Sequence, residues 1–126
     1  MDEPTPDLTR RRLLLGGAVL LQCAVLYWPR AVGNPGDLPL DKLVHAAIFG
    51  LVAWAGIRAG VPVGRLVGLL LAQAILSEVI QDRLLPHRSG DPWDAVADTV
   101  GTFVGVFVAR SAPRPAMMRG MWGSGR

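Results

Sequence analysis

Residues able to transfer protons are spread along the chain but share one setting, the ends of apolar stretches. Glu78 lies near the end of one stretch, Asp94 and Asp98 lie at the start of the next, and His45 lies near the start of an earlier one. Charged groups are costly in apolar surroundings and are usually retained there for function. Imidazole and carboxyl groups are common general acids and bases. We therefore interpret His45, Glu78, Asp94 and Asp98 as candidate catalytic residues.

A second set of polar residues accompanies these four and could hold a substrate. The candidate substrate-binding residues are Asp41, Lys42, Gln81, Arg88, Ser89 and Asp91. Lys42 and Arg88 are suited to bind a phosphate or carboxylate group. They could equally pair with the acidic side chains and only lock helix ends together, which is the structural alternative.

A metal site is the third interpretation of the same residues. Asp94 and Asp98 lie four positions apart, so on a helix the two carboxylates repel each other unless they share a cation. That cation could be a basic side chain, a proton or a metal ion. His45, Glu78 and Asp98 offer imidazole and carboxylate ligands, but no H-x-x-x-H or comparable spacing supports them. The sequence therefore identifies neither a metal nor a cofactor.

Helical spacing predicts that these residues meet. Residues three or four positions apart lie on one face of a helix, as do the pairs 41/45, 78/81 and 94/98. With a rise of about 1.5 Å per residue, His45 lies about 6 Å deeper than Asp41, and Asp98 about 6 Å deeper than Asp94. Glu78 lies a similar step inward on the third expected helix. The pattern predicts one shared site at shallow depth, formed by three helices.

Four apolar runs must position this site, and each is expected to form a helix. The expected helices cover residues 13–28, 43–57, 66–84 and 93–109, with connections rich in proline or glycine at 29–40 and 86–92. Each apolar core is shorter than the ~20 residues that span a typical bilayer, so a soluble bundle of buried helices is the alternative. The runs nevertheless lack a polar face of their own, and hydrophobic residues make up 51% of the chain. These features predict an all-α membrane bundle of four transmembrane helices over residues 13–109.

The positively charged residues predict the orientation in the membrane. One side of the expected bundle carries nine of them: Arg10, Arg11, Arg12, Arg58, Arg65, Arg110, Arg114, Arg119 and Arg126. The other side carries four: Arg30, Lys42, Arg83 and Arg88. Cytoplasmic loops hold the excess of Lys and Arg. We therefore expect cytoplasmic tails at 1–12 and 110–126, the second of them disordered, and a multi-pass protein of the bacterial inner membrane.

Several other residues have structural interpretations. Gly101 and Gly105 have the small-xxx-small spacing that lets helices approach closely. Asp41 and Asp91 are expected helix N-caps, and Ser77 is expected to hydrogen-bond to its own helix. The chain shows no basic stripe with interleaved aromatics, which argues against nucleic-acid binding. An Arg-Arg-x-Leu-Leu pattern resembles an export signal, but no cleavage motif follows it, so the first apolar run is expected to remain in the membrane.

The order of motifs between residues 41 and 105 resembles the VanZ-like family of small bacterial membrane proteins. The resemblance lies in Asp41-Lys42-x-x-His45, Glu78-x-x-Gln81, Arg88-Ser89-x-Asp91-x-x-Asp94 and Asp98-x-x-Gly101-x-x-x-Gly105. It implies a bundle of several helices in the plasma membrane, and the family is named for a protein linked to low-level teicoplanin resistance. It implies no defined reaction. Asp98 stands where the family usually has Asn, so either the site tolerates more negative charge or this carboxyl carries a proton.

Two functional hypotheses follow from the residues and the resemblance. The leading one is an outward-facing polar site that binds or acts on a lipid or cell-envelope precursor head group. The competing one is a non-enzymatic membrane scaffold or accessory subunit whose polar cluster only holds the helices together. A transporter fits less well, because Gln22 and Gln73 are the few polar residues deeper in the apolar runs.

Overall fold

The structure is a computed structural model that describes residues 5–28, 38–86 and 88–112. These residues form four α-helices and no strand. The helices are α1 (Pro6–Tyr27), α2 (Leu38–Arg58), α3 (Val63–Leu84) and α4 (Pro92–Ser111). The prediction of an all-α chain is therefore confirmed for the described residues.

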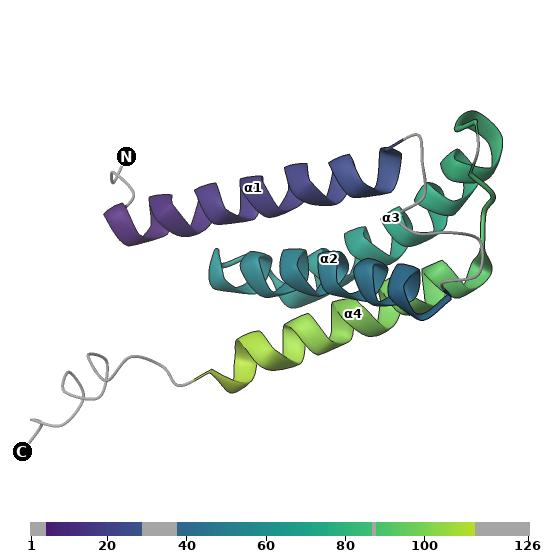
Figure 1. The fold of residues 1–126 in the computed structure, drawn as a ribbon. Coiled ribbons are helices and arrows are strands. Elements are labelled where there is room, and N and C mark those ends of the chain that lie inside the picture. The colour runs from purple at the N-terminus through teal and green to yellow at the C-terminus, as the bar shows by residue number, and fades with distance from the viewer. Residues whose placement is uncertain (1–4, 29–37, 87, 113–126) are drawn as a thin grey trace, which may run out of the picture.

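Successive helices run in alternating directions, as Figure 1 shows. The start of α1, the α2–α3 connection and the end of α4 lie at one end of the bundle. The end of α1, the start of α2 and the α3–α4 connection lie at the other end. This arrangement brings the start of α2, the end of α3 and the start of α4 together, as the expected shared site requires.

The first three helices begin earlier than the apolar runs indicate, α2 at Leu38. α1 begins at Pro6, so the residues from Pro6 onward that were expected in a tail are helical. Proline is well suited to the first turn of a helix, and a 2.6 Å ion pair between Asp7 and Arg11, four residues apart, supports that turn. α3 begins at Val63, directly after Pro62. Hydrophobicity locates the apolar centre of a helix but misses polar turns that extend it.

Individual residues explain where α2 ends and α4 begins, and one of the two expected N-caps is absent. Gly60 has φ of 85° after α2, a left-handed conformation that glycine adopts readily. Asp91 caps α4 as predicted, because its side chain accepts a hydrogen bond from the backbone N–H of Trp93 at 3.0 Å. Asp41 does not cap α2, because the helix begins at Leu38 and places Asp41 inside the first turn. The predicted loop at 29–40 and the predicted tail at 110–126 lie largely outside the described residues.

Glycines set the contact between α2 and α4. A Cβ added to Gly101 would collide with the carbonyl oxygen of Ala46, and one added to Gly105 would collide with that of Gly50. The two backbones therefore approach closely enough to exclude any side chain at these positions. This confirms the packing role predicted from the small-xxx-small spacing.

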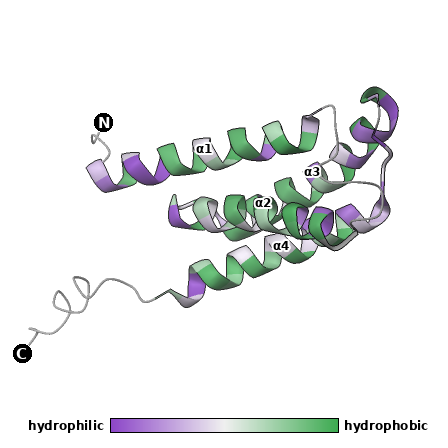
Figure 2. Ribbon diagram, viewed as in Figure 1, coloured by the Kyte–Doolittle hydropathy of each residue, from purple (hydrophilic) through white to green (hydrophobic). Residues whose placement is uncertain are grey.

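The bundle places apolar side chains outside and several polar ones inside. Large hydrophobic side chains are exposed on all four helices, for example Leu20, Leu43, Ile75 and Phe107. The buried polar residues are Gln22, His45, Ser77, Gln81, Asp94, Asp98 and Thr102. Figure 2 shows hydrophobic residues along the middle of the helices and hydrophilic ones mainly towards their ends.

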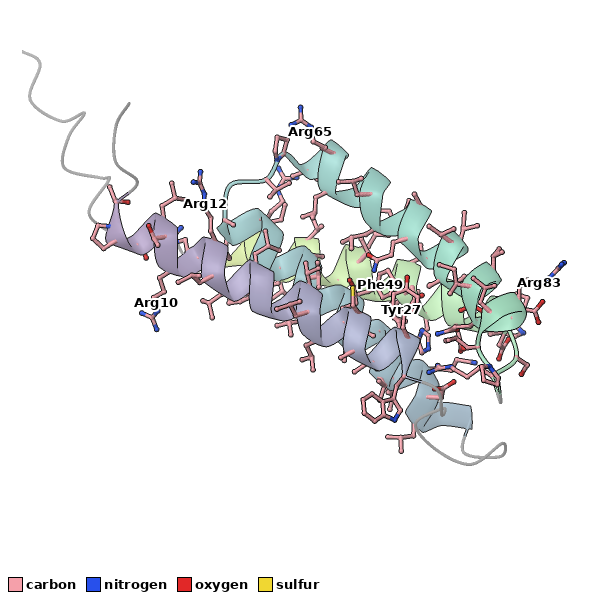
Figure 3. All side chains as sticks on the ribbon, turned by 90° about the horizontal axis from the view of Figure 1, so that it is seen from above. Arg10, Arg12, Tyr27, Phe49, Arg65 and Arg83 are labelled. Atoms are coloured by element: carbon pink, nitrogen blue, oxygen red, sulfur yellow. The ribbon has the colours of Figure 1, made fainter. Side chains whose placement is uncertain are left out.

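Two of the helices are long and apolar enough to cross a membrane by length and composition alone. They are α2 over Leu40–Arg58 and α3 over Val63–Leu84. Each of the other two carries charges within its length, three consecutive arginines in α1 and two aspartates in α4. In Figure 3 the labelled Arg10, Arg12 and Arg65 lie at one end of the bundle, and Arg83 lies at the other.

Candidate functional site

His45 is fully buried and lies between two aspartates of α4. Its Nδ1 lies 2.8 Å from Oδ1 of Asp98, and its Nε2 lies 3.7 Å from Oδ2 of Asp94. All three side chains are at most 5% exposed. The backbone carbonyl of Asp98 accepts a hydrogen bond from the Thr102 hydroxyl, four residues further along α4, at 2.8 Å. An imidazole fixed this way by a carboxylate has a defined orientation and can accept or donate a proton at its other nitrogen.

Lys42 joins the start of α2 to the start of α4. Its ammonium lies 2.5 Å from Oδ2 of Asp91 and also contacts Asp94. The Lys42 ammonium, together with the Trp93 N–H, lowers the pKa of the Asp91 carboxyl below its usual value. One residue predicted to bind substrate is thus already paired with two carboxylates.

Glu78 brings α3 into the same cluster. Its Oε2 accepts a hydrogen bond from the backbone N–H of Asp91 at 2.7 Å. Its Oε1 is buried and has no hydrogen-bond partner among the described residues. The same holds for Oδ2 of Asp98. Two carboxylate oxygens are therefore available to a ligand or a proton inside the bundle.

The predicted meeting of three helices is confirmed by the positions of the donor atoms. One donor atom each from His45, Glu78 and Asp98 lies within 4.8 Å of the others. Asp41, His45 and Asp94 form a second such group. Periodicity placed these residues at similar depth, and the close contact between α2 and α4 supplies the lateral approach that periodicity does not predict. We call His45, Glu78, Asp94 and Asp98 together with Asp41, Lys42 and Asp91 the polar cluster.

The other predicted binding residues make different contacts. Gln81 is buried and donates a hydrogen bond from Nε2 to the carbonyl of Leu26 at 2.9 Å. Arg88 donates to the carbonyls of Val25 at 3.4 Å and Trp28 at 3.2 Å. Among the described residues Arg88 contacts no carboxylate, so the expected pairing with the acidic residues is wrong. Gln81 and Arg88 instead hold the end of α1, where unpaired helix carbonyls attract donors.

Ser89 is exposed in the connection between α3 and α4. No side-chain hydrogen bond of Ser89 occurs among the described residues. Ser89 therefore makes no hydrogen bond to the polar cluster in the part of the chain that the structure describes.

A groove between α3 and α4 reaches the polar cluster from outside. Its volume is about 420 Å³. Apolar and small residues line part of it, namely Ile75, Val79, Gly90, Pro92 and Ala95, and Glu78, Asp82 and Arg83 line the rest. Glu78 therefore belongs both to the wall of this groove and to the cluster of buried donor atoms.

Two buried polar residues, Gln22 and Thr102, were not predicted from the sequence to lie in the interior of the bundle. Gln22 on α1 is 1% exposed, and neither atom of its amide has a partner among the described residues. Thr102 is fully buried beneath Asp98. Their positions carried a signal, because Gln22 lies four residues from both Ala18 and Leu26 on the buried face of α1, and Thr102 lies four residues after Asp98.

Comparisons with protein-family models, curated proteins and solved structures give no significant match to this chain.

Proposed function

We propose that the chain is a multi-pass membrane protein with four transmembrane helices. The inside-out distribution of side chains supports this: exposed leucines, valines and phenylalanines cover the outside, while His45, Asp94 and Asp98 are buried. In a bilayer the charged residues of a helix bundle face its interior and pair with one another. The acids of α4 satisfy this rule by facing α2, and the arginines of α1 lie at its end (Figure 3).

The arginines also give the bundle an orientation. The positive-inside rule assigns the arginine-rich end, with the start of α1 and the end of α4, to the cytoplasm. The polar cluster then faces the outer leaflet of a bacterial inner membrane. Membership in the VanZ-like family, and with it any role in glycopeptide resistance, belongs to the same proposal and rests on the motifs between Asp41 and Gly105.

The function that this geometry supports best is binding, and proton transfer to or from, the head group of a lipid or cell-envelope precursor. The carrying observation is that Glu78 lies in both the open groove and the buried cluster. A molecule in the groove can therefore contact the side chain of Glu78, which has a donor atom within 4.8 Å of donor atoms of His45 and Asp98. The apolar lining of the groove suits an acyl chain, and the polar lining suits a head group.

The contacts narrow the class of head group. Lys42 is committed to two aspartates and Arg88 to the carbonyls of α1. A hydroxyl- or amine-bearing group, as in a glycolipid, meets the carboxylate of Glu78 at the groove more favourably than a bare phosphate does. In this proposal Asp98 orients His45, and His45 and Glu78 exchange a proton with the bound hydroxyl or amine.

The pairing of Lys42 favours a second candidate, a membrane scaffold without enzymatic activity. One ammonium holding Asp91 and Asp94 ties the start of α2 to the start of α4. A scaffold needs nothing further from the cluster. It leaves the unpaired oxygens of Glu78 and Asp98 without a purpose, and for this reason we rank it second.

Lipid retention separates the two candidates. The full chain is extracted from membranes in mild detergent, and its bound lipids are identified by native mass spectrometry. Glu78→Gln should lose most of the retained lipid while keeping its abundance, whereas Asp7→Asn, a matched change at the opposite end, should retain it. Equal retention in wild type and Glu78→Gln would favour the scaffold.

Cysteine labelling tests the membrane topology. In a Cys23→Ser background, Ser89→Cys and Ser111→Cys introduce thiols at exposed positions at the two ends of the bundle. A maleimide that does not cross membranes should label the first and not the second in intact cells, and both after lysis. Labelling of both in intact cells would contradict the proposed orientation.

A further inference from the structure

Negative charge exceeds positive charge in the polar cluster. Its carboxylates are Asp41, Glu78, Asp91, Asp94 and Asp98. Its one permanently charged cation, Lys42, contacts Asp91 and Asp94. Among the described residues no lysine or arginine contacts Glu78 or Asp98. Buried carboxylates are costly unless a cation or hydrogen bonds compensate them. Asp98 has His45 as its partner and Glu78 has one backbone N–H, so the second oxygen of each is left for a proton or a bound cation.

The unpaired atoms locate that charge. Asp98 is fully buried, and its Oδ2 has no hydrogen-bond partner among the described residues. Oε1 of Glu78 is likewise buried and unpaired. Each oxygen keeps lone pairs free in a place that water does not reach.

The donor geometry matches a small cation. His45, Glu78 and Asp98 each offer one donor atom, and these atoms lie within 4.8 Å of one another. Two ligands of one zinc ion, each at about 2.0–2.2 Å, lie at most about 4.4 Å apart, so small side-chain rotations suffice. The three ligands come from α2, α3 and α4, whose positions are fixed independently by helix packing.

We propose that His45, Glu78 and Asp98 together bind one divalent metal ion of the Zn²⁺ or Mn²⁺ type. An imidazole nitrogen with two carboxylate oxygens suits these ions, whereas Mg²⁺ and Ca²⁺ prefer oxygen ligands alone. The inference deepens the proposed function and rests on it for its purpose: with the ion bound, His45 and Glu78 act as its ligands in place of proton carriers, and the ion attracts the oxygen atoms of a head group in the groove. Glu78 is the ligand through which the groove reaches the ion.

Metal binding is measured directly on the full chain in detergent. The protein is stripped with a chelator, and Zn²⁺ or Mn²⁺ alone is titrated by calorimetry, with bound metal counted by elemental analysis. We expect one equivalent per chain. Glu78→Gln and Asp98→Asn should each weaken binding by about 100-fold or more, the upper end of the loss seen when an outer-shell partner is removed, and Asp7→Asn should leave it unchanged.

A thermal measurement guards against variants that fail to fold. The ion should raise the unfolding temperature of wild type and Asp7→Asn, because it binds the folded state, but not that of folded Glu78→Gln. Binding below one equivalent in wild type would overturn the proposal. So would unchanged binding in Glu78→Gln, and so would loss of binding in Asp41→Asn alone, which would assign the ion to the neighbouring group of Asp41, His45 and Asp94.

Lipid retention measured with and without chelator keeps this inference separate from the proposed function. Retention of lipid by a chain that binds no metal leaves the function standing and removes the metal site. Metal binding without lipid retention in any variant removes the function and leaves the metal site.

Discussion

The contact of α4 with α2 differs from the contact of α1 with the rest of the bundle. Gly101 and Gly105 lie directly against the backbone of α2, and the ion pairs of the polar cluster span the same interface. On α1, by contrast, Gly16 and Gly17 lie on the exposed face, with nothing within 4 Å of an added Cβ. The described hydrogen bonds between α1 and the rest of the bundle lie near its two ends, from Arg11 at the start and to the carbonyls of Val25, Leu26 and Trp28 at the end.

The difference shows where this fold needs rigidity. The polar cluster is built on the two helices that approach most closely, where glycine excludes alternative packings. A site on rigidly packed helices keeps its groups in position. α1 covers the bundle and is fastened at its ends, by Arg11 to the carbonyl of Arg58 at 3.3 Å and by Gln81 to that of Leu26 at 2.9 Å.

The largest effect on stability is expected when a methyl group is added at Gly101 in the contact between α2 and α4, and the same change at Gly17 of α1 serves as the comparison. Gly101→Ala places its Cβ against the Ala46 carbonyl and should destabilise the fold by about 3 kcal/mol. Gly17→Ala adds the same group where space is open and should stabilise α1 by about 0.5–1 kcal/mol. Thermal unfolding in detergent, followed by circular dichroism, measures both. Equal unfolding temperatures of the two variants would contradict the close contact between α4 and α2.

Removing the charge that joins α2 to α4 should have the next largest effect. Lys42→Met leaves Asp94, whose side chain is 5% exposed, without its cation. Breaking buried pairs costs about 3–5 kcal/mol, and the partial exposure of Lys42 reduces this to about 2 kcal/mol. Adding Asp94→Asn to Lys42→Met should recover most of the loss, which a double-mutant cycle measures. A double variant less stable than Lys42→Met would contradict the pairing.

The two contacts were unequally predictable from the sequence. The α2–α4 contact was indicated by Gly101 and Gly105 and by the like charges of Asp94 and Asp98, because both patterns follow helical periodicity. Lys42 was one of the cations proposed for these acids, and its contacts with Asp91 and Asp94 confirm that alternative. Periodicity says which face of a helix is polar, but it does not choose among the possible cations.

The contacts of α1 could not be predicted in the same way. Arg88 was expected to bind a carboxylate or a substrate, but it donates to backbone carbonyls at the end of α1. Every helix end offers such carbonyls whatever its sequence, so no residue pattern marks them. The N-terminal extension of α1 to Pro6 was missed for a related reason, since a polar first turn carries no hydrophobic signal.

Two buried glutamines, Gln22 and Gln81, are expected to give smaller and opposite changes in stability. Gln22→Leu removes an amide that has no partner among the described residues and should stabilise the fold by about 1 kcal/mol. Gln81→Leu removes the hydrogen bond to Leu26 and should destabilise it by about 1 kcal/mol. Chemical unfolding of the two variants in parallel gives the comparison. A loss of stability in Gln22→Leu would mean that its amide has a partner.

The smallest effect concerns pH. The pKa of Asp91 is lowered in the folded state by Lys42, so its contribution to stability is complete above the unfolded pKa of about 3.9 and is lost as the pH falls through the folded pKa. Asp91→Asn keeps the helix cap but loses the ion pair. The difference in unfolding temperature between wild type and this variant should be constant from pH 7 to pH 5 and shrink towards pH 3. A difference that grows with acidification would contradict the pairing.

The central claim is that Glu78, whose Oε1 is unpaired in the polar cluster, is retained for a ligand and not for stability. The unfolding temperature of Glu78→Gln in detergent, without added metal, tests it most directly, because glutamine keeps the acceptor for the Asp91 N–H and removes one uncompensated charge. We predict an unfolding temperature equal to or above that of wild type. A fall of several degrees would mean that Glu78 serves to hold the helices together, and would contradict the account.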